Sequence, residues 1–232
     1  MKKVLLFSLS CVLLLGSIMT TYAEQNNSEE LLIDQEDFRR NATMNETLLS
    51  DGSYEIVLTQ ELDFPVTRSS AEEQHHKQNI VKIIAFDEDT ASAIKNAVRS
   101  PGGSNMTHDS YLGDSFYAQI QLDYSSKSAG IATLYRVDNV VITTSVNSGT
   151  TITAKEFRYS CIGAEEGGAP YYKEDSINIK NASNPYTTTI MSAFPYVYNP
   201  GTGHLGVSLH FTVKRPSGQT LTDALTNNLF LS

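Results

Sequence analysis

The sequence is poor in cysteine, contains no tryptophan and has few basic residues. Its two cysteines are Cys11 and Cys161, and Cys11 lies in an apolar amino-terminal segment that we expect to be removed. Cys161 would then have no partner within the chain, which excludes a disulfide scaffold. We therefore expect the fold to depend on burial of apolar side chains and on hydrogen bonds.

The shortage of basic residues limits the classes of partner. The chain has 17 lysine and arginine residues against 26 aspartate and glutamate residues, with a formal net charge of −9. Affinity for nucleic acids depends mainly on neutralising phosphates with basic side chains, so we expect no nucleic-acid partner. The same charge argument disfavours binding to anionic membranes.

A long apolar run occurs only at the amino end of the sequence. Lys2 and Lys3 precede VLLFSLSCVLLLGSIM, and the small residues Thr21 and Ala23 follow it. This order is typical of a secretory signal peptide, here residues 1–23, cleaved after Ala23. Cleavage would remove two lysines and no acidic residue, so the secreted, extracellular protein would be still more acidic than the full chain.

The next part of the chain predicts little regular structure and then two strands and a helix. Residues 24–50 are polar and acidic without a sustained helical period, and we expect a mobile leader or a short helix there. In residues 51–104, apolar alternation predicts a strand at 53–63, and NIVKIIAF predicts another at 79–86. A helix start at Asp87 and a stop at Pro101 predict one short helix at about 88–99.

Residues 105–232 are typical of antiparallel β-structure. Six runs with β-type composition follow one another, separated by Gly, Pro and Asn, and we expect a bend in the second near Asp138 and Asn139. We predict a mainly β protein, an antiparallel β-sandwich with one short helix, in which residues 51–232 form a single β-rich domain. The six runs are SFYAQIQLDY, GIATLYRVDNVVITTSV, TITAKEFRYSCIG, SINIK, TTTIMSAFPYVY and HLGVSLHFTVKR.

Residues 71–86, AEEQHHKQNIVKIIAF, place two histidines before an apolar run. A helical zinc pair needs histidines at positions i and i+4, and His75 and His76 are adjacent. Spacing identifies no third ligand, although His108, His204 and His210 are available elsewhere. We therefore predict a solvated loop leading into a strand, and we expect neither a metal site nor a cofactor.

Two groups of residues raise the question of catalysis. Cys161 is a candidate nucleophile with His204 or His210 downstream, but no local signature surrounds it, and we predict a buried, inert cysteine. Four acidic residues near a glycine-rich loop allow a paired-carboxylate hydrolase, although adjacent acids in a turn are usually solvated. These are Glu165, Glu166, Glu174 and Asp175. We expect no catalytic residue, and a hydrolase using this region or Cys161 is the last of three interpretations.

Tyrosines crowd into two short stretches. Tyrosine combines a flat apolar face with a polar tip, which suits carbohydrate and protein surfaces, while the same rings are also able to fill a β core. We predict binding residues at Tyr171, Tyr172, Tyr196 and Tyr198.

Val140 to Lys155, VVITTSVNSGTTITAK, resembles the Ser/Thr-rich membrane hairpins of β-pore-forming proteins in composition. Thr144, Asn147 and Thr150 interrupt both faces of this expected hairpin, so a soluble hairpin is favoured. Our main hypothesis is a secreted, non-catalytic interaction module that binds cell-wall carbohydrate or an extracellular protein. A membrane-acting, pore-forming protein is the second hypothesis, and only under it do we expect a membrane partner.

Overall fold

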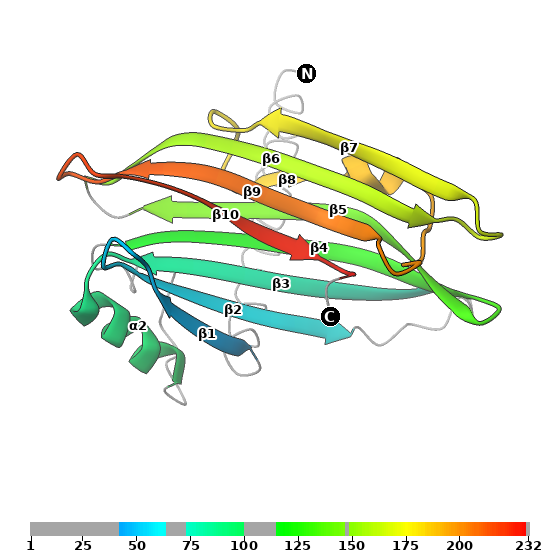
Figure 1. The fold of residues 1–232 in the computed structure, drawn as a ribbon, viewed down its shortest axis with the longest axis horizontal. Coiled ribbons are helices and arrows are strands. Elements are labelled where there is room, and N and C mark those ends of the chain that lie inside the picture. The colour runs from blue at the N-terminus through cyan, green and yellow to red at the C-terminus, as the bar shows by residue number, and fades with distance from the viewer. Residues whose placement is uncertain (1–41, 64–72, 100–114, 147–148, 231–232) are drawn as a thin grey trace, which may run out of the picture. The chain divides into compact units, whose positions relative to one another are not determined.

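The computed structural model describes residues 42–63, 73–99, 115–146 and 149–230. Their strands form two antiparallel sheets, drawn in Figure 1. The six-stranded sheet has the order β1 (Thr43–Leu48), β2 (Tyr54–Asp63), β3 (Glu73–Ala85), β4 (Ser115–Ala129), β5 (Ala132–Val146) and β8 (Tyr186–Thr188). The four-stranded sheet has the order β10 (Thr220–Asn228), β9 (His204–Lys214), β6 (Thr151–Ala164) and β7 (Pro170–Asn178).

The two sheets pack into the β-sandwich that the sequence predicts, with a shared apolar core. Phe116 of β4 meets Phe211 of β9 with ring centroids 4.3 Å apart, which joins the two layers. Period-two alternation supplies this core: Phe157, Tyr159 and Cys161 of β6 are buried, while the residues between them point to the other side of the sheet. Burial of these side chains is the main source of stability in a chain without disulfides.

The predicted helix is confirmed as α2 (Glu88–Arg99). Asp87 precedes it, and its carboxylate accepts hydrogen bonds from the backbone N–H of Thr90 at 2.7 Å and from the Thr90 hydroxyl at 2.8 Å. These bonds satisfy donors that the first turn of a helix leaves free. Ala91 and Ile94 are fully buried, and the helix packs against β2 and β3 near one end of the six-stranded sheet.

The bend expected at Asp138 and Asn139 is a β-bulge. Asp123 pairs with Asn139 and Tyr124 pairs with Val137, which leaves Asp138 as the extra residue on β5. A bulge turns the side chains that follow it and increases the local twist of the strand. Asp138 thereby joins the polar network described below.

The predicted loop around His75 and His76 is wrong, because β3 begins at Glu73 and includes both histidines. Residues 73–78 are all polar, so they show no apolar alternation. They are held as a strand by pairing with the long β4, in which Glu73 lies opposite Lys127 and His75 opposite Ser125. The backbone hydrogen bonds between β3 and β4 do not require apolar side chains on one face of this segment.

Three other predictions of secondary structure also need correction. The expected hairpin at Val140 to Lys155 does not form, because β5 pairs with β4 and β8 while β6 pairs with β7 and β9 in the other sheet. The run TTTIMSAFPYVY is not a continuous strand: it contains the end of the short β8, the 3-10 helix η1 (Ile190–Ala193) and isolated β-bridges at Val197 and Tyr198. Strands β1 and β10 were not predicted, and β1 lies within residues 24–50, where a leader was expected.

Candidate functional site

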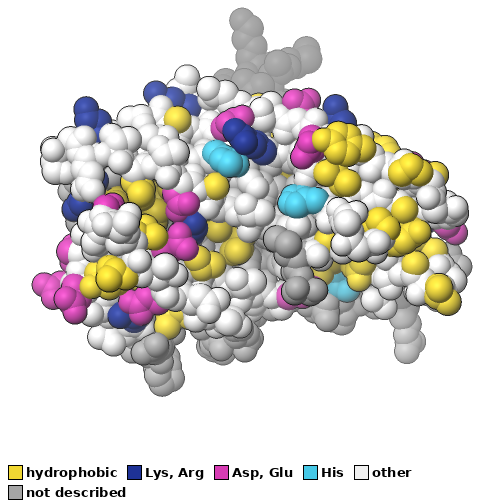
Figure 2. Space-filling model, viewed as in Figure 1, with side chains coloured by type: hydrophobic (Ala, Val, Ile, Leu, Met, Phe, Trp, Pro, Cys, Tyr) yellow, Lys and Arg dark blue, Asp and Glu magenta, His cyan; other side chains and the backbone are white. Residues whose placement is uncertain are grey.

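A hollow of about 640 Å³ lies on the outer face of the four-stranded sheet. Figure 2 shows histidine side chains among acidic and basic ones over this part of the molecule. The lining comes from three neighbouring strands, β6, β7 and β9, and most of its residues are polar. It consists of Glu156, Arg158, Tyr159, Ser160, Ile162, Glu174, Asp175, Ser176, His204, Gly206, Val207 and Ser208.

Strand alternation explains why polar groups meet here. On β6 the residues between the buried Phe157, Tyr159 and Cys161 point outward, and two of these are Arg158 and Ser160. The pairing of β6 with β7 and β9 then brings their outward residues into the same rows. The hollow therefore depends on strand register as much as on residue type.

Ser160 and His204 form the centre of the hollow. The Ser160 hydroxyl is hydrogen-bonded to Nδ1 of His204, although the two residues are 44 positions apart in the sequence. Ser160 is only 7% exposed and His204 is half-buried. Burial lowers the pKa of His204, and the nearby Glu174 opposes this only in part. His204 is therefore neutral at pH 7, with one ring nitrogen as donor and the other as acceptor.

Gly206 forms part of the floor of the hollow next to this pair. It lies opposite Ser160 on β6 and Asn228 on β10. A β-carbon at Gly206 would lie 2.1 Å from the carbonyl oxygen of Asn227. Any side chain there would have to displace the backbone of β10, so this position requires glycine.

Charged side chains surround the central pair. Arg158 forms an ion pair with Glu156 at 3.0 Å, and the hydrogen bond from Arg158 lowers the pKa of Glu156. On β7 the Tyr172 hydroxyl donates a hydrogen bond to Glu174, which raises the pKa of Tyr172. The hollow thus offers carboxylate acceptors, guanidinium donors and groups that do both.

Of the four tyrosines predicted to bind a ligand, Tyr172 lies beside the hollow and is 68% exposed. It is opposite Ile162 on the same outer face, in the row that continues to His204. Tyr171 points to the other side and packs against Phe194 with ring centroids 6.2 Å apart. Tyr198 is partly buried where its backbone bridges Ala164 at the end of β6.

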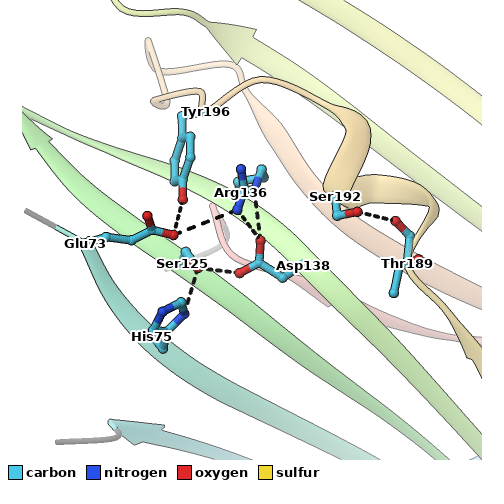
Figure 3. Close-up of polar contacts among 8 residues, drawn as sticks. All are labelled: Glu73, His75, Ser125, Arg136, Asp138, Thr189, Ser192 and Tyr196. Carbon is cyan, nitrogen blue, oxygen red and sulfur yellow. Dashed lines mark hydrogen bonds and ion pairs between the residues drawn. The ribbon is translucent and has the colours of Figure 1, made fainter. Parts of the chain in front are cut away.

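Tyr196 belongs to a separate polar network, shown in Figure 3. Its hydroxyl donates a hydrogen bond to Glu73 at 2.6 Å, and its ring lies 4.5 Å from the Arg136 guanidinium carbon and 5.0 Å from the Lys127 nitrogen. Arg136 also pairs with Asp138 at 2.8 Å. Burial raises the pKa of Tyr196 to about 12. These contacts hold the segment before β9 against β3, β4 and β5.

The same network contains a serine and a histidine within hydrogen-bonding distance. The Ser125 hydroxyl donates to Asp138, so Nδ1–H of His75 must donate to the Ser125 oxygen, at 2.9 Å. Ser125 is fully buried. A substrate therefore has no access to its hydroxyl, and the arrangement is structural rather than catalytic.

The two histidines that suggested a metal site have protein partners. Nε2 of His76 lies 2.8 Å from the Ser126 hydroxyl, and its ring stacks on Tyr124 with centroids 4.8 Å apart. Among the residues that the structure describes, no three His, Cys, Asp or Glu side chains are grouped closely enough to hold a metal ion. His108 lies outside the described residues.

Cys161 is fully buried, as predicted. Burial, reinforced by the charge of Glu165, raises the pKa of its thiol to about 12. Cys161 faces the core whereas His204 lines the hollow on the opposite face of the sheet. This Cys–His pair is therefore unable to act as nucleophile and base.

The four acidic residues do not gather into a catalytic pair. Glu165 and Glu166 lie in the turn after β6, whereas Glu174 lies opposite Ser160, about five residues back along the strands. That distance is roughly 16 Å of strand, beyond the roughly 5–10 Å that separates the carboxyl groups of glycosidases. Glu174 and Asp175 line the hollow and Glu165 and Glu166 do not.

Sequence reasoning singled out Tyr172, Glu174 and His204, although it gave Glu174 and His204 other roles. It missed Glu156, Arg158 and Ser160. These three residues are outward-facing residues of β6, and the alternation along this strand is visible in the sequence. That they form part of a site becomes clear only once β7 and β9 are known to flank β6.

Within the described part of the chain, no helix is long and apolar enough to cross a membrane. Comparisons of the sequence and the structure with protein families, curated proteins and solved structures found no match. Function is therefore inferred from the hollow itself.

Proposed function

We propose that the protein is a secreted, non-catalytic β-sandwich module that binds a hydroxylated ligand, of the carbohydrate class found in cell walls, in the hollow on its four-stranded sheet. The observation that carries this proposal is the lining: carboxylates, a guanidinium, serines and a neutral histidine on one face. Sugar hydroxyl groups both donate and accept hydrogen bonds, and this lining offers both.

Tyr172 adds the second element of such a site. Its ring is 68% exposed and stands beside the hollow, where it offers an apolar face to the less polar side of a sugar ring. Its hydroxyl is engaged by Glu174, which restricts its orientation. A ring held in this way loses little conformational entropy when a ligand stacks on it.

The absence of catalysis is part of the proposal. It is supported by the burial of Cys161 and Ser125 and by the distance along the strands between the Glu165 turn and Glu174. The pore-forming alternative has less support than the binding module, because β5 and β6 belong to different sheets and do not pair with each other as a hairpin. Secretion rests on the signal peptide expected at residues 1–23.

The test is co-sedimentation of purified residues 24–232 with washed cell walls, with neutral liposomes and with no target. We expect pelleting with walls only. The variant Tyr172→Ala should bind about five- to tenfold more weakly, as expected for an anchor residue that contributes about 1 kcal/mol. His204→Ala should also weaken binding, and Leu48→Ala, which removes a comparably exposed side chain from β1 of the other sheet, should not.

Pelleting with liposomes would contradict the proposal and favour a membrane-acting protein. Wall binding that is unchanged in Tyr172→Ala and His204→Ala, with melting temperatures also unchanged, would place the binding surface outside the hollow. A protein that remains in the supernatant with every target would refute wall binding.

A further inference from the structure

The charges around the hollow are unevenly balanced. Glu156 is paired with Arg158 at 3.0 Å, and Asp175 lies 3.8 Å from Lys173. Glu174 differs from both: its contact is the neutral Tyr172 hydroxyl, and in the described ranges no lysine or arginine lies within ion-pair distance of it. One carboxylate of the lining therefore has no cationic partner among the residues that the structure describes.

The histidine of the hollow does not supply that cation at neutral pH. His204 interacts with Glu174, but burial lowers its pKa and it stays neutral. The protein as a whole also carries a formal net charge of −9, so its long-range field adds to the negative potential near Glu174. An anionic ligand would be repelled both at a distance and in contact.

Position relates Glu174 to the hydroxyl-binding groups. Glu174 lies directly opposite Ser160 across β6 and β7, and Ser160 is bonded to His204. Cross-strand neighbours on one face have β-carbons about 4.5–5.5 Å apart. A single sugar unit can therefore reach the Glu174 carboxylate with one substituent and the Ser160–His204 pair with another.

We infer that the ligand is an amino sugar polymer, whose positively charged amine lies against Glu174 while its hydroxyl groups meet Ser160 and His204. This inference rests on the proposed carbohydrate-binding function and narrows it. The hollow should prefer free-amine glycans to neutral ones and should reject glycans that carry carboxylates. Glu174 is then the residue that determines this preference.

The test compares three oligosaccharides of equal length by titration calorimetry: an oligomer of glucosamine, its N-acetylated form and an oligomer of a uronic acid. At low ionic strength the amine form should bind about three- to fivefold more tightly than the acetylated form, which is the upper part of the range for an exposed ion pair. The uronic acid should bind most weakly. The preference for the amine should disappear near 1 M salt, where charges are screened within about 3 Å.

Variants separate charge at the hollow from charge in general. Glu174→Gln should bind the amine and acetylated forms equally. Glu88→Gln removes an exposed carboxylate from the first turn of α2, on the other sheet, and should keep the preference. Tyr172→Phe removes the hydroxyl that donates a hydrogen bond to Glu174, and it should keep or increase the preference for the amine form. This variant provides a second readout if Glu174→Gln folds poorly.

The outcomes distinguish the two proposals. Equal binding of all three oligosaccharides, or a preference that survives in Glu174→Gln, would overturn the inference about the amine and leave carbohydrate binding intact. Binding of none would overturn both. A lysine oligopeptide that binds as tightly as the amine oligosaccharide would show that the hollow recognises the cation alone, and the assignment to an amino sugar would fail.

Discussion

Replacing Lys82 with methionine would remove the cation that links the two sheets at β3 and β10. Lys82 is buried, and its Nζ donates to Glu55 on β2 at 2.8 Å, to Asp223 on β10 at 2.8 Å and to the Ala224 carbonyl at 2.7 Å. One side chain thus satisfies two carboxylates from different sheets. Methionine keeps most of the length and the apolar stem, so the substitution isolates the charge.

The size of the loss follows from the geometry. Both carboxylate oxygens lie 2.8 Å from the same nitrogen, so without Lys82 the two acids would face each other at no more than about twice that distance. Breaking a fully buried ion pair costs about 3–5 kcal/mol. The side chains of Glu55 and Asp223 retain 21% and 29% exposure, which allows some solvation, and we expect a loss of about 2–3 kcal/mol.

Urea unfolding, followed by circular dichroism, measures this loss as a change in the free energy of unfolding. For a domain of this size the melting temperature should fall by about 5–10 °C. The triple variant Lys82→Met, Glu55→Gln, Asp223→Asn should recover most of the stability, because it removes the unpaired charges as well. The reasoning is refuted if Lys82→Met is as stable as the wild type, or if the triple variant is no more stable than the single one.

Two further predictions concern buried groups. Lys155 is buried in the sandwich, where its Nζ donates to the Thr144 hydroxyl at 3.4 Å, and burial lowers its pKa from the ordinary value of 10.5. Between the lowered pKa and 10.5 the unfolded chain binds more protons than the folded protein, so stability due to this group rises with pH. Lys155→Met should therefore be more stable than the wild type by about 1 kcal/mol at pH 7. Urea unfolding at a series of pH values should show this advantage declining towards pH 10.5, whereas Lys180→Met, at an exposed position, should show no such trend. An advantage of Lys155→Met that is constant with pH would contradict this. Cys161, with its pKa raised to about 12, should react with a thiol reagent far more slowly in the folded protein than in 6 M guanidinium chloride, and equal rates would show that it is accessible.

The parts of the fold that could be predicted are those with a local physical signal. Alternation of apolar residues predicted β2 and the long strands of the sandwich, and the capping residue Asp87 predicted the start of α2. The start of β3 and the strands β1 and β10 were missed because many of their residues are polar. Their strand conformation is stabilised by the backbone of a neighbouring strand, which no local pattern reveals.

The candidate site was predictable only in part, for a related reason. Tyr172 was identified because tyrosines that crowd into a short stretch are a compositional signal. The Ser160–His204 pair was not, because it depends on β6 and β9 being neighbours and on their register. A shift of one residue in that register would turn Ser160 towards the core and Cys161 towards the solvent.

The crossing of the chain between β5 and β6 has a consequence for how the protein is made. Strands β1 to β5 pair in the order in which they are synthesised, so five of the six strands of the large sheet can assemble while the rest of the chain, including β8, is still emerging. Strands β6 and β7 cannot complete the second sheet alone, because β9 and β10 must dock beside β6. Until residues 204–228 have appeared, the apolar inner face of the large sheet has no complete cover. The nascent chain is therefore most prone to aggregation shortly before its synthesis ends, and docking of the last two strands determines whether it folds or aggregates.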